Sequence, residues 1–201
     1  MTSIHFQKAT YFTSAVELSQ LPPDMGAEIA FIGRSNAGKS SALNAITGVK
    51  GLARVSQTPG RTQMINLFSL DESHRLVDLP GYGYAKAPLS VQTKWRVMTA
   101  DYLEHRAALK GLVLIMDSRH PLQEADKELI DWSTDFSLKL HILLTKADKL
   151  NHSAQQKTLQ TVCRALRDVI DAGLVSVQLF SAPKRIGVDE AREQLAQWFR
   201  D

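Results

Sequence analysis

The chain has 201 residues, 44% of them hydrophobic and 22% charged, which suits one globular domain with its own core rather than two domains. Its single cysteine, Cys163, excludes an intramolecular disulfide and favours a reducing, intracellular setting. No apolar run approaches the ~20 residues of a membrane-spanning helix, and the N-terminus lacks a signal-peptide pattern. We therefore expect a cytoplasmic protein without membrane association.

The net charge of +3 is unevenly distributed along the chain. Residues 1–100 contain 10 Lys or Arg against 6 Asp or Glu, whereas residues 101–201 contain 14 against 15. Most of the basic excess lies in one segment, in the residues Lys50, Arg54, Arg61, Arg75, Lys86, Lys94 and Arg96. This segment is either a solvated basic face or a surface for an anionic partner such as RNA.

Hydrophobic periodicity and turn residues divide the chain into alternating strands and helices. The predicted strands lie at 28–33, 64–70, 74–79, 111–117, 140–145 and 174–180. The predicted helices lie at 40–47, 90–108, 122–135, 153–170 and 188–199. This alternation predicts an α/β domain over 28–201, with a mostly parallel six-stranded sheet, helices on both faces and 64–70 as an antiparallel edge strand. Residues 1–27 are predicted to be an N-terminal extension packed on that domain.

The octapeptide Gly33-Arg34-Ser35-Asn36-Ala37-Gly38-Lys39-Ser40 lies between a predicted strand and a predicted helix and has the spacing of a P-loop. Its glycines let the backbone N–H groups curl around a phosphate, and the helix start adds the positive end of its dipole. Lys39 can reach the β- and γ-phosphates, and the Ser40 hydroxyl suits Mg²⁺. This motif predicts nucleotide binding but leaves kinases, ATPases and GTPases open.

Two further segments favour a GTPase. Asp78-Leu79-Pro80-Gly81 ends the third predicted strand, where a GTPase has an Asp that holds Mg²⁺ through water and a Gly whose N–H meets the γ-phosphate. Gly60-Arg61-Thr62 lies in the preceding loop, where a GTPase places the Thr that closes over Mg²⁺ and the γ-phosphate. The position of Thr62 in this loop argues against a metabolic kinase.

A third site is predicted for the base. Thr145-Lys146-Ala147-Asp148 follows a predicted strand, and the Asp148 carboxylate can accept hydrogen bonds from guanine N1–H and N2–H₂, a donor pair that adenine lacks. Thr145 stands where the common motif has Asn. Phe180-Ser181-Ala182, at the end of the last predicted strand, fits the loop whose N–H meets guanine O6.

Together these segments resemble the EngB (YihA/YsxC) family of bacterial GTPases, in the TrmE–Era–EngA–EngB–septin group, over almost the whole chain. The resemblance rests on Gly33–Ser41, Thr58–Gln63, Asp78–Ala85 and Thr145–Asp148, and it implies a Ras-like P-loop GTPase fold. It implies Mg²⁺ ligation by Ser40 and Thr62, with Asp78 acting through water, and catalysis by Lys39, Thr62 and Gly81. The implied GTP or GDP contacts are Gly33, Arg34, Ser35, Asn36, Ala37, Gly38, Lys39, Ser40, Ser41, Gly60, Arg61, Thr62, Gln63, Met64, Asp78, Leu79, Pro80, Gly81, Thr145, Lys146, Ala147, Asp148, Phe180, Ser181 and Ala182.

The resemblance also implies a biological setting. The family is associated with assembly of the large ribosomal subunit, and its loss with defects in division and septation. A ribosomal partner, the large subunit or its precursor, would face the basic segment around the predicted switches, and the protein is expected to act as a monomer. A ribosome- or RNA-binding module with incidental hydrolysis remains an alternative, as does a P-loop nucleotide kinase.

Tyr82 stands where Ras-like GTPases have the Gln that orients the attacking water, and no arginine finger is evident, so we expect slow intrinsic turnover accelerated by a partner. Asn36 is either a K⁺ ligand beside the phosphates or a plain hydrogen-bonding residue of the loop. Tyr82 and Tyr84 either pack internally or stack on a partner. Cys163 is predicted to lie in the core.

Overall fold

The computed structural model describes residues 4–53, 64–82 and 89–201, without the side chains of residues 89–96. The strands are β1 (Thr10–Ala15), β2 (Ala27–Gly33), β3 (Ile65–Ser69), β4 (His74–Asp78), β5 (Leu109–Asp117), β6 (Leu140–Thr145) and β7 (Val175–Leu179). The helices are α1 (Lys39–Thr47), α2 (Leu89–His105), α3 (Glu124–Asp135), α4 (His152–Ala165), α5 (Arg167–Asp171) and α6 (Val188–Trp198). Short 3₁₀ turns cover Phe6–Lys8, Leu18–Gln20 and Ala147–Lys149.

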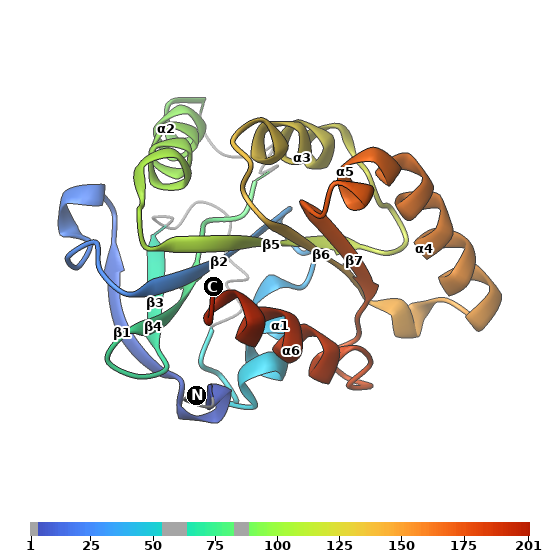
Figure 1. The fold of residues 1–201 in the computed structure, drawn as a ribbon, viewed down its shortest axis with the longest axis horizontal. Coiled ribbons are helices and arrows are strands. Elements are labelled where there is room, and N and C mark those ends of the chain that lie inside the picture. The colour runs from blue at the N-terminus through green and yellow to red at the C-terminus, as the bar shows by residue number, and fades with distance from the viewer. Residues whose placement is uncertain (1–3, 54–63, 83–88) are drawn as a thin grey trace.

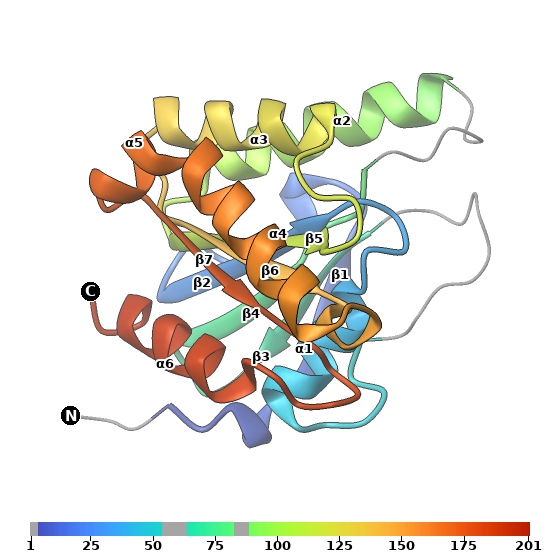
Figure 2. The same cartoon turned by 90° about the vertical axis from the view of Figure 1, so that its right-hand side faces the viewer.

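The seven strands in the described part of the chain form one sheet in the order β1-β3-β4-β2-β5-β6-β7 (Figure 1). From β4 to β7 all neighbours in this order pair in parallel, while β3 is antiparallel to both β1 and β4. Helices α1 and α6 cover one face, and α2, α3, α4 and α5 cover the other (Figure 2). The predicted α/β architecture with helices on both faces is confirmed.

The edge of the sheet differs from the prediction. β1 adds a seventh strand outside β3, so the antiparallel strand predicted at 64–70 is not the edge. The pattern of β1 is hidden in the sequence because its register shifts between Tyr11 and Thr13 and only Ala15 of the strand is buried. The N-terminal segment therefore does more than pack on the domain, since it pairs with the sheet.

The described part of the chain has a hydrophobic core on each side of the central strand β2. Every residue of β2 is buried, as expected for a parallel strand with helices on both faces. Phe31 lies in the same core as Leu43 of α1 and Leu195 of α6, whereas Ile32 lies in the core that α2, α3 and α4 cover. The end of β2 is thereby fixed in place, and it leads directly into the predicted phosphate loop.

Helix α3 buries a different stripe from the one predicted. The sequence places Leu122, Ala125, Leu129 and Trp132 on one helical face, but all four are only partly buried. The most buried positions lie one residue further along, at Asp126, Ile130 and Ser133. A capping box between Gln123 and Asp126 begins the helix and holds the Asp126 carboxylate inward. Hydrophobic periodicity alone does not reveal an inward-facing carboxylate.

A buried ionic network joins the start of β2 to the end of α2. Glu28 is fully buried and accepts hydrogen bonds from Arg106 Nε (3.0 Å), Arg106 Nη2 (2.7 Å) and Tyr102 Oη (2.8 Å). Arg75 Nη1 lies 3.7 Å from Glu28 and donates to the Met25 carbonyl. Arg75 therefore belongs to this network, and its assignment to a free basic face is wrong.

Candidate functional site

The predicted phosphate loop connects the end of β2 to the start of α1. A Cβ at Gly33 would lie only 2.5 Å from the Ile115 carbonyl oxygen of β5, so this strand end requires glycine. Gly38 has φ 103°, in the left-handed region, and immediately precedes α1. The loop therefore ends where backbone N–H groups at a helix N-terminus point outward, which is the geometry of an anion site.

Lys39 and Asp78 meet beside this helix start. Asp78 ends β4, the parallel neighbour of β2, and its largely buried carboxylate forms an ion pair with Lys39 Nζ. Ser40 follows Lys39 in the first turn of α1. The Ser40 hydroxyl and the Asp78 carboxylate are oxygen groups that suit Mg²⁺, and the Lys39 amine suits the phosphate oxygens that would accompany it.

Thr145 takes over the position of the usual Asn at the end of β6. Its hydroxyl hydrogen-bonds to the Ala37 carbonyl of the phosphate loop and lies 3.1 Å from the Met116 carbonyl of β5. Lys146 Nζ donates to the Asn36 carbonyl at 2.7 Å. Two neighbouring residues thus connect the predicted base motif to the phosphate loop across 108 and 110 positions of sequence.

The Asp148 carboxylate, which is predicted to read guanine, is held by the loop that follows β7. Ser181 Oγ donates to Asp148 Oδ1 at 2.6 Å, and this hydrogen bond lowers the pKa of Asp148. The Ala147 N–H donates to the Phe180 carbonyl at 3.1 Å, which joins the two predicted base segments. Asp148 is therefore ionised at neutral pH, as an acceptor for two base N–H donors must be.

Asp117 is a member of this cluster that the sequence pattern does not predict. Its carboxylate, at the end of β5, lies 2.9 Å from Lys146 Nζ and 2.7 Å from Arg119 Nη2. Burial acts to raise the pKa of Asp117, but the hydrogen bonds from Arg119 and Lys146 outweigh it and hold the pKa below its ordinary value. Its only sequence signal is a carboxylate as the last residue of an apolar strand. Asp117 holds the amine of Lys146 in place.

The predicted switch residues are only partly covered by the described residues. Gly60, Arg61, Thr62 and Gln63 lie outside them, and so does Tyr84. The Mg²⁺ role of Thr62 thus stays a prediction. Met64 is exposed and directly precedes β3.

Tyr82 lies inside the protein. It is 8% exposed, and its phenol donates a hydrogen bond to Asp126 Oδ1 of α3 at 2.5 Å. Of the two alternatives for Tyr82, internal packing is therefore correct and stacking on a partner is wrong. A buried phenol in this position does not orient a water molecule as the Gln of Ras-like GTPases does.

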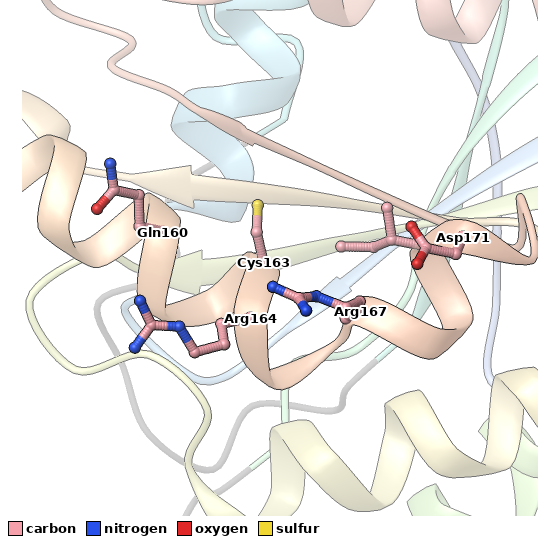
Figure 3. A pocket seen from close by; sticks show the side chains of 6 residues that line it. Gln160, Cys163, Arg164, Arg167 and Asp171 are labelled. Carbon is pink, nitrogen blue, oxygen red and sulfur yellow. The ribbon is translucent and has the colours of Figure 1, made fainter.

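A hollow of about 350 Å³ lies over α4 and α5 (Figure 3). It is lined by Gln160, Cys163, Arg164, Arg167, Ile170 and Asp171. None of the predicted nucleotide contacts lines it. Cys163 is half-buried rather than in the core. The predicted helix 153–170 is interrupted at Leu166, which separates α4 from α5.

The described residues include no group of three or more His, Cys, Asp or Glu side chains placed to hold a metal ion. Within these same ranges, no helix is both long enough and apolar enough to cross a membrane.

The fold and the site together define a P-loop GTPase. A family model described as "50S ribosome-binding GTPase" matches residues 28–146. The "Probable GTP-binding protein EngB" of Coxiella burnetii (strain RSA 331 / Henzerling II) is 58% identical over 195 residues, 97% of this chain and 94% of that protein. The protein of the same name from Idiomarina loihiensis is 52% identical over 196 residues, 98% of this chain and 94% of that protein. The chain belongs to the EngB family of GTP-binding proteins, as the sequence predicts.

Solved structures support the same fold. The crystal structure of a probable GTP-binding protein engB has a TM-score of 0.70 at 22% identity, covering 87% of this chain and 99% of that one. A variant of Era from Aquifex aeolicus, bound to GDP.AlF4-, has a TM-score of 0.65 at 16% identity, covering 87% of this chain and 57% of that one. The Ras-like GTPase fold is confirmed, and the protein binds GTP and GDP as a GTPase.

Proposed function

We propose that this GTPase is a Mg²⁺-dependent switch that binds the large ribosomal subunit or its precursor during assembly. It acts in the cytoplasm as a monomer, and the supply of ribosomes links it to normal division and septation. The observation that supports this best is the family model, which matches more than half of the chain and is described as a 50S ribosome-binding GTPase. Basic residues around the predicted switches supply an attraction for ribosomal RNA.

The site residues have separate roles in this proposal. Lys39 neutralises the β- and γ-phosphates, and the Gly81 N–H meets the γ-phosphate. Ser40 and Thr62 hold Mg²⁺ directly, while Asp78 holds it through water. Asp148 reads guanine. When bound, Mg²⁺ supplies positive charge at the phosphate oxygens.

The proposal predicts that binding to ribosomal subunits depends on the nucleotide. Large subunits are sedimented with the protein in GTP, in GDP and in a non-hydrolysable GTP analogue. A switch with different loop conformations in the two states gives a clear difference in co-sedimentation between the analogue and GDP. Equal co-sedimentation in all three would favour the alternative, a ribosome-binding module for which hydrolysis is incidental. Small subunits serve as the control, and equal binding to both subunits would contradict a specific large-subunit role.

We further propose that intrinsic turnover is slow and that K⁺ beside Asn36 supports it. Asn36 has φ 63°, its carbonyl accepts from Lys146, and the residue is part of the phosphate loop. K⁺ there would supply the charge that an arginine finger provides elsewhere. Single-turnover GTP hydrolysis by the isolated protein is expected below about 1 s⁻¹, since unassisted Ras is near ~10⁻⁴ s⁻¹, and faster in K⁺ than in Na⁺ buffer. Equal rates in the two buffers would contradict the K⁺ site.

A further inference from the structure

Asp126 is a buried carboxylate with no role in the site as described so far. It is fully buried, and among the described residues it forms no ion pair within 4.0 Å. Its Oδ1 accepts from the Tyr82 phenol at 2.5 Å, and its Oδ2 accepts from the Gln123 N–H at 3.0 Å. Burying a carboxylate costs free energy unless hydrogen bonds satisfy it, so both bonds hold it firmly to its partners.

Tyr82 is also held at its backbone. Its N–H donates to the Gly33 carbonyl at 3.1 Å, and its carbonyl accepts from the Ser35 N–H at 2.9 Å. These two bonds form a parallel bridge between Arg34 and Tyr82. The residue after Gly81 is thus attached to the phosphate loop by its backbone and to α3 by its side chain.

Gly81 lies between this anchor and the end of β4. It is buried, and a Cβ on it would lie 3.0 Å from the Gly33 carbonyl oxygen, so its backbone runs close against the phosphate loop. Asp78 is paired within the sheet on one side of Gly81, and Tyr82 is bridged to the phosphate loop on the other, so the backbone at Gly81 lies between two anchored residues. Preorganised N–H donors stabilise a charged oxygen without a reorganisation cost.

We propose that Tyr82 and Asp126 are positioning residues that hold the Gly81 N–H ready for the γ-phosphate. The inference rests on the proposed role of Gly81 and is independent of the ribosomal partner. GTP has a γ-phosphate and GDP does not, so the Tyr82–Asp126 hydrogen bond contributes to binding of GTP but not of GDP.

The test compares affinities for a non-hydrolysable GTP analogue and for GDP in the isolated full-length protein with Mg²⁺. Tyr82→Phe removes the phenol hydroxyl alone and is expected to weaken analogue binding about five- to tenfold, with GDP affinity changed less than about twofold. Asp126→Ala is expected to lower the ratio of analogue affinity to GDP affinity as Tyr82→Phe does. The double variant should lower this ratio no further, because both substitutions remove the same hydrogen bond. Asp126→Asn keeps an oxygen that can accept a hydrogen bond from the phenol. Its ratio of analogue affinity to GDP affinity is therefore expected to stay close to that of the unchanged protein.

Tyr102→Phe is the matched control. Tyr102 is also a buried tyrosine whose phenol donates to a fully buried carboxylate, Glu28, at 2.8 Å, but at the opposite end of β2. Thermal unfolding should show both Tyr→Phe variants folded, with comparable losses of stability. The proposal is overturned if Tyr82→Phe weakens both nucleotides equally, if it leaves the ratio unchanged, or if Tyr102→Phe changes the ratio as much. Failure of the unchanged protein to bind either nucleotide would instead contradict the nucleotide site itself.

Discussion

Asp148→Asn is expected to shift the preference of the protein from guanine to xanthine nucleotides. The Asp148 carboxylate accepts from N1–H and N2–H₂ of guanine, and asparagine opposes one of these donors with its own NH₂. Xanthine has a carbonyl in place of the 2-amino group, so asparagine can pair with it through one donor and one acceptor. A bidentate base contact contributes about 1–3 kcal/mol to discrimination, so GTP affinity should fall roughly 5- to 150-fold while XTP affinity rises. Equilibrium binding of GDP, GTP and XTP measures both changes.

Asp117→Asn is the matched control for this experiment. It is the same chemical change in a carboxylate of the same cluster, 2.9 Å from Lys146 Nζ. Because Asp117 holds Lys146 and does not read the base, its replacement should weaken guanine and xanthine nucleotides alike. A gain of XTP affinity in Asp117→Asn, or none in Asp148→Asn, would contradict the assignment of Asp148.

Glu28→Gln is expected to cause the largest loss of stability. The substitution removes the charge that Arg106 faces at 2.7 Å, and the Arg106 side chain is only 8% exposed. Removing one partner of a buried ion pair costs up to about 3–5 kcal/mol. The more exposed Asp24 carboxylate, 3.4 Å from Arg106 Nε, compensates the remaining charge only in part. Chemical denaturation should show this loss as a lower midpoint with an unchanged slope. Nucleotide affinity of the folded protein should change little, since the network lies at the opposite end of β2 from the phosphate loop.

Asp201→Asn is the control for the loss of an ion pair as such. Asp201 Oδ2 lies 2.6 Å from Lys139 Nζ, and both side chains are close to half-exposed. Solvent and salt screen such a pair, so the denaturation midpoint should not change measurably. A midpoint shift as large as that of Glu28→Gln would show that burial is not the cause.

The site was predictable from the sequence where its chemistry depends on neighbouring residues. A phosphate loop needs glycines, a lysine and a hydroxyl at fixed spacing. The segment Gly33–Ser40 can therefore be recognised as a phosphate loop from the sequence alone. The same holds for Asp78–Gly81 and for Thr145–Asp148, each of which begins with the last residue of an apolar strand. Parallel strands bring such strand ends together at one edge of the sheet, and the structure joins these segments there.

Other residues of the site were not predictable, because their roles depend on contacts between distant segments. The phenol of Tyr82 donates a hydrogen bond to Asp126, which lies 44 positions further along the chain. Asp117, at the end of β5, forms an ion pair with Lys146, which follows β6. Neither carboxylate has a local pattern that distinguishes it from a solvated one. Arg75 likewise reads as surface charge until the fold places it against Glu28.

The sequence by itself therefore determined the class of protein, the nucleotide and the strands β2 to β7, because local spacing and periodicity encode them. The tertiary structure alone decided the outer strand β1, the buried stripe of α3 and the anchor of Tyr82. Each of these depends on hydrogen bonds or burial between segments far apart in the chain, whose free energy appears only when the fold brings the partners together.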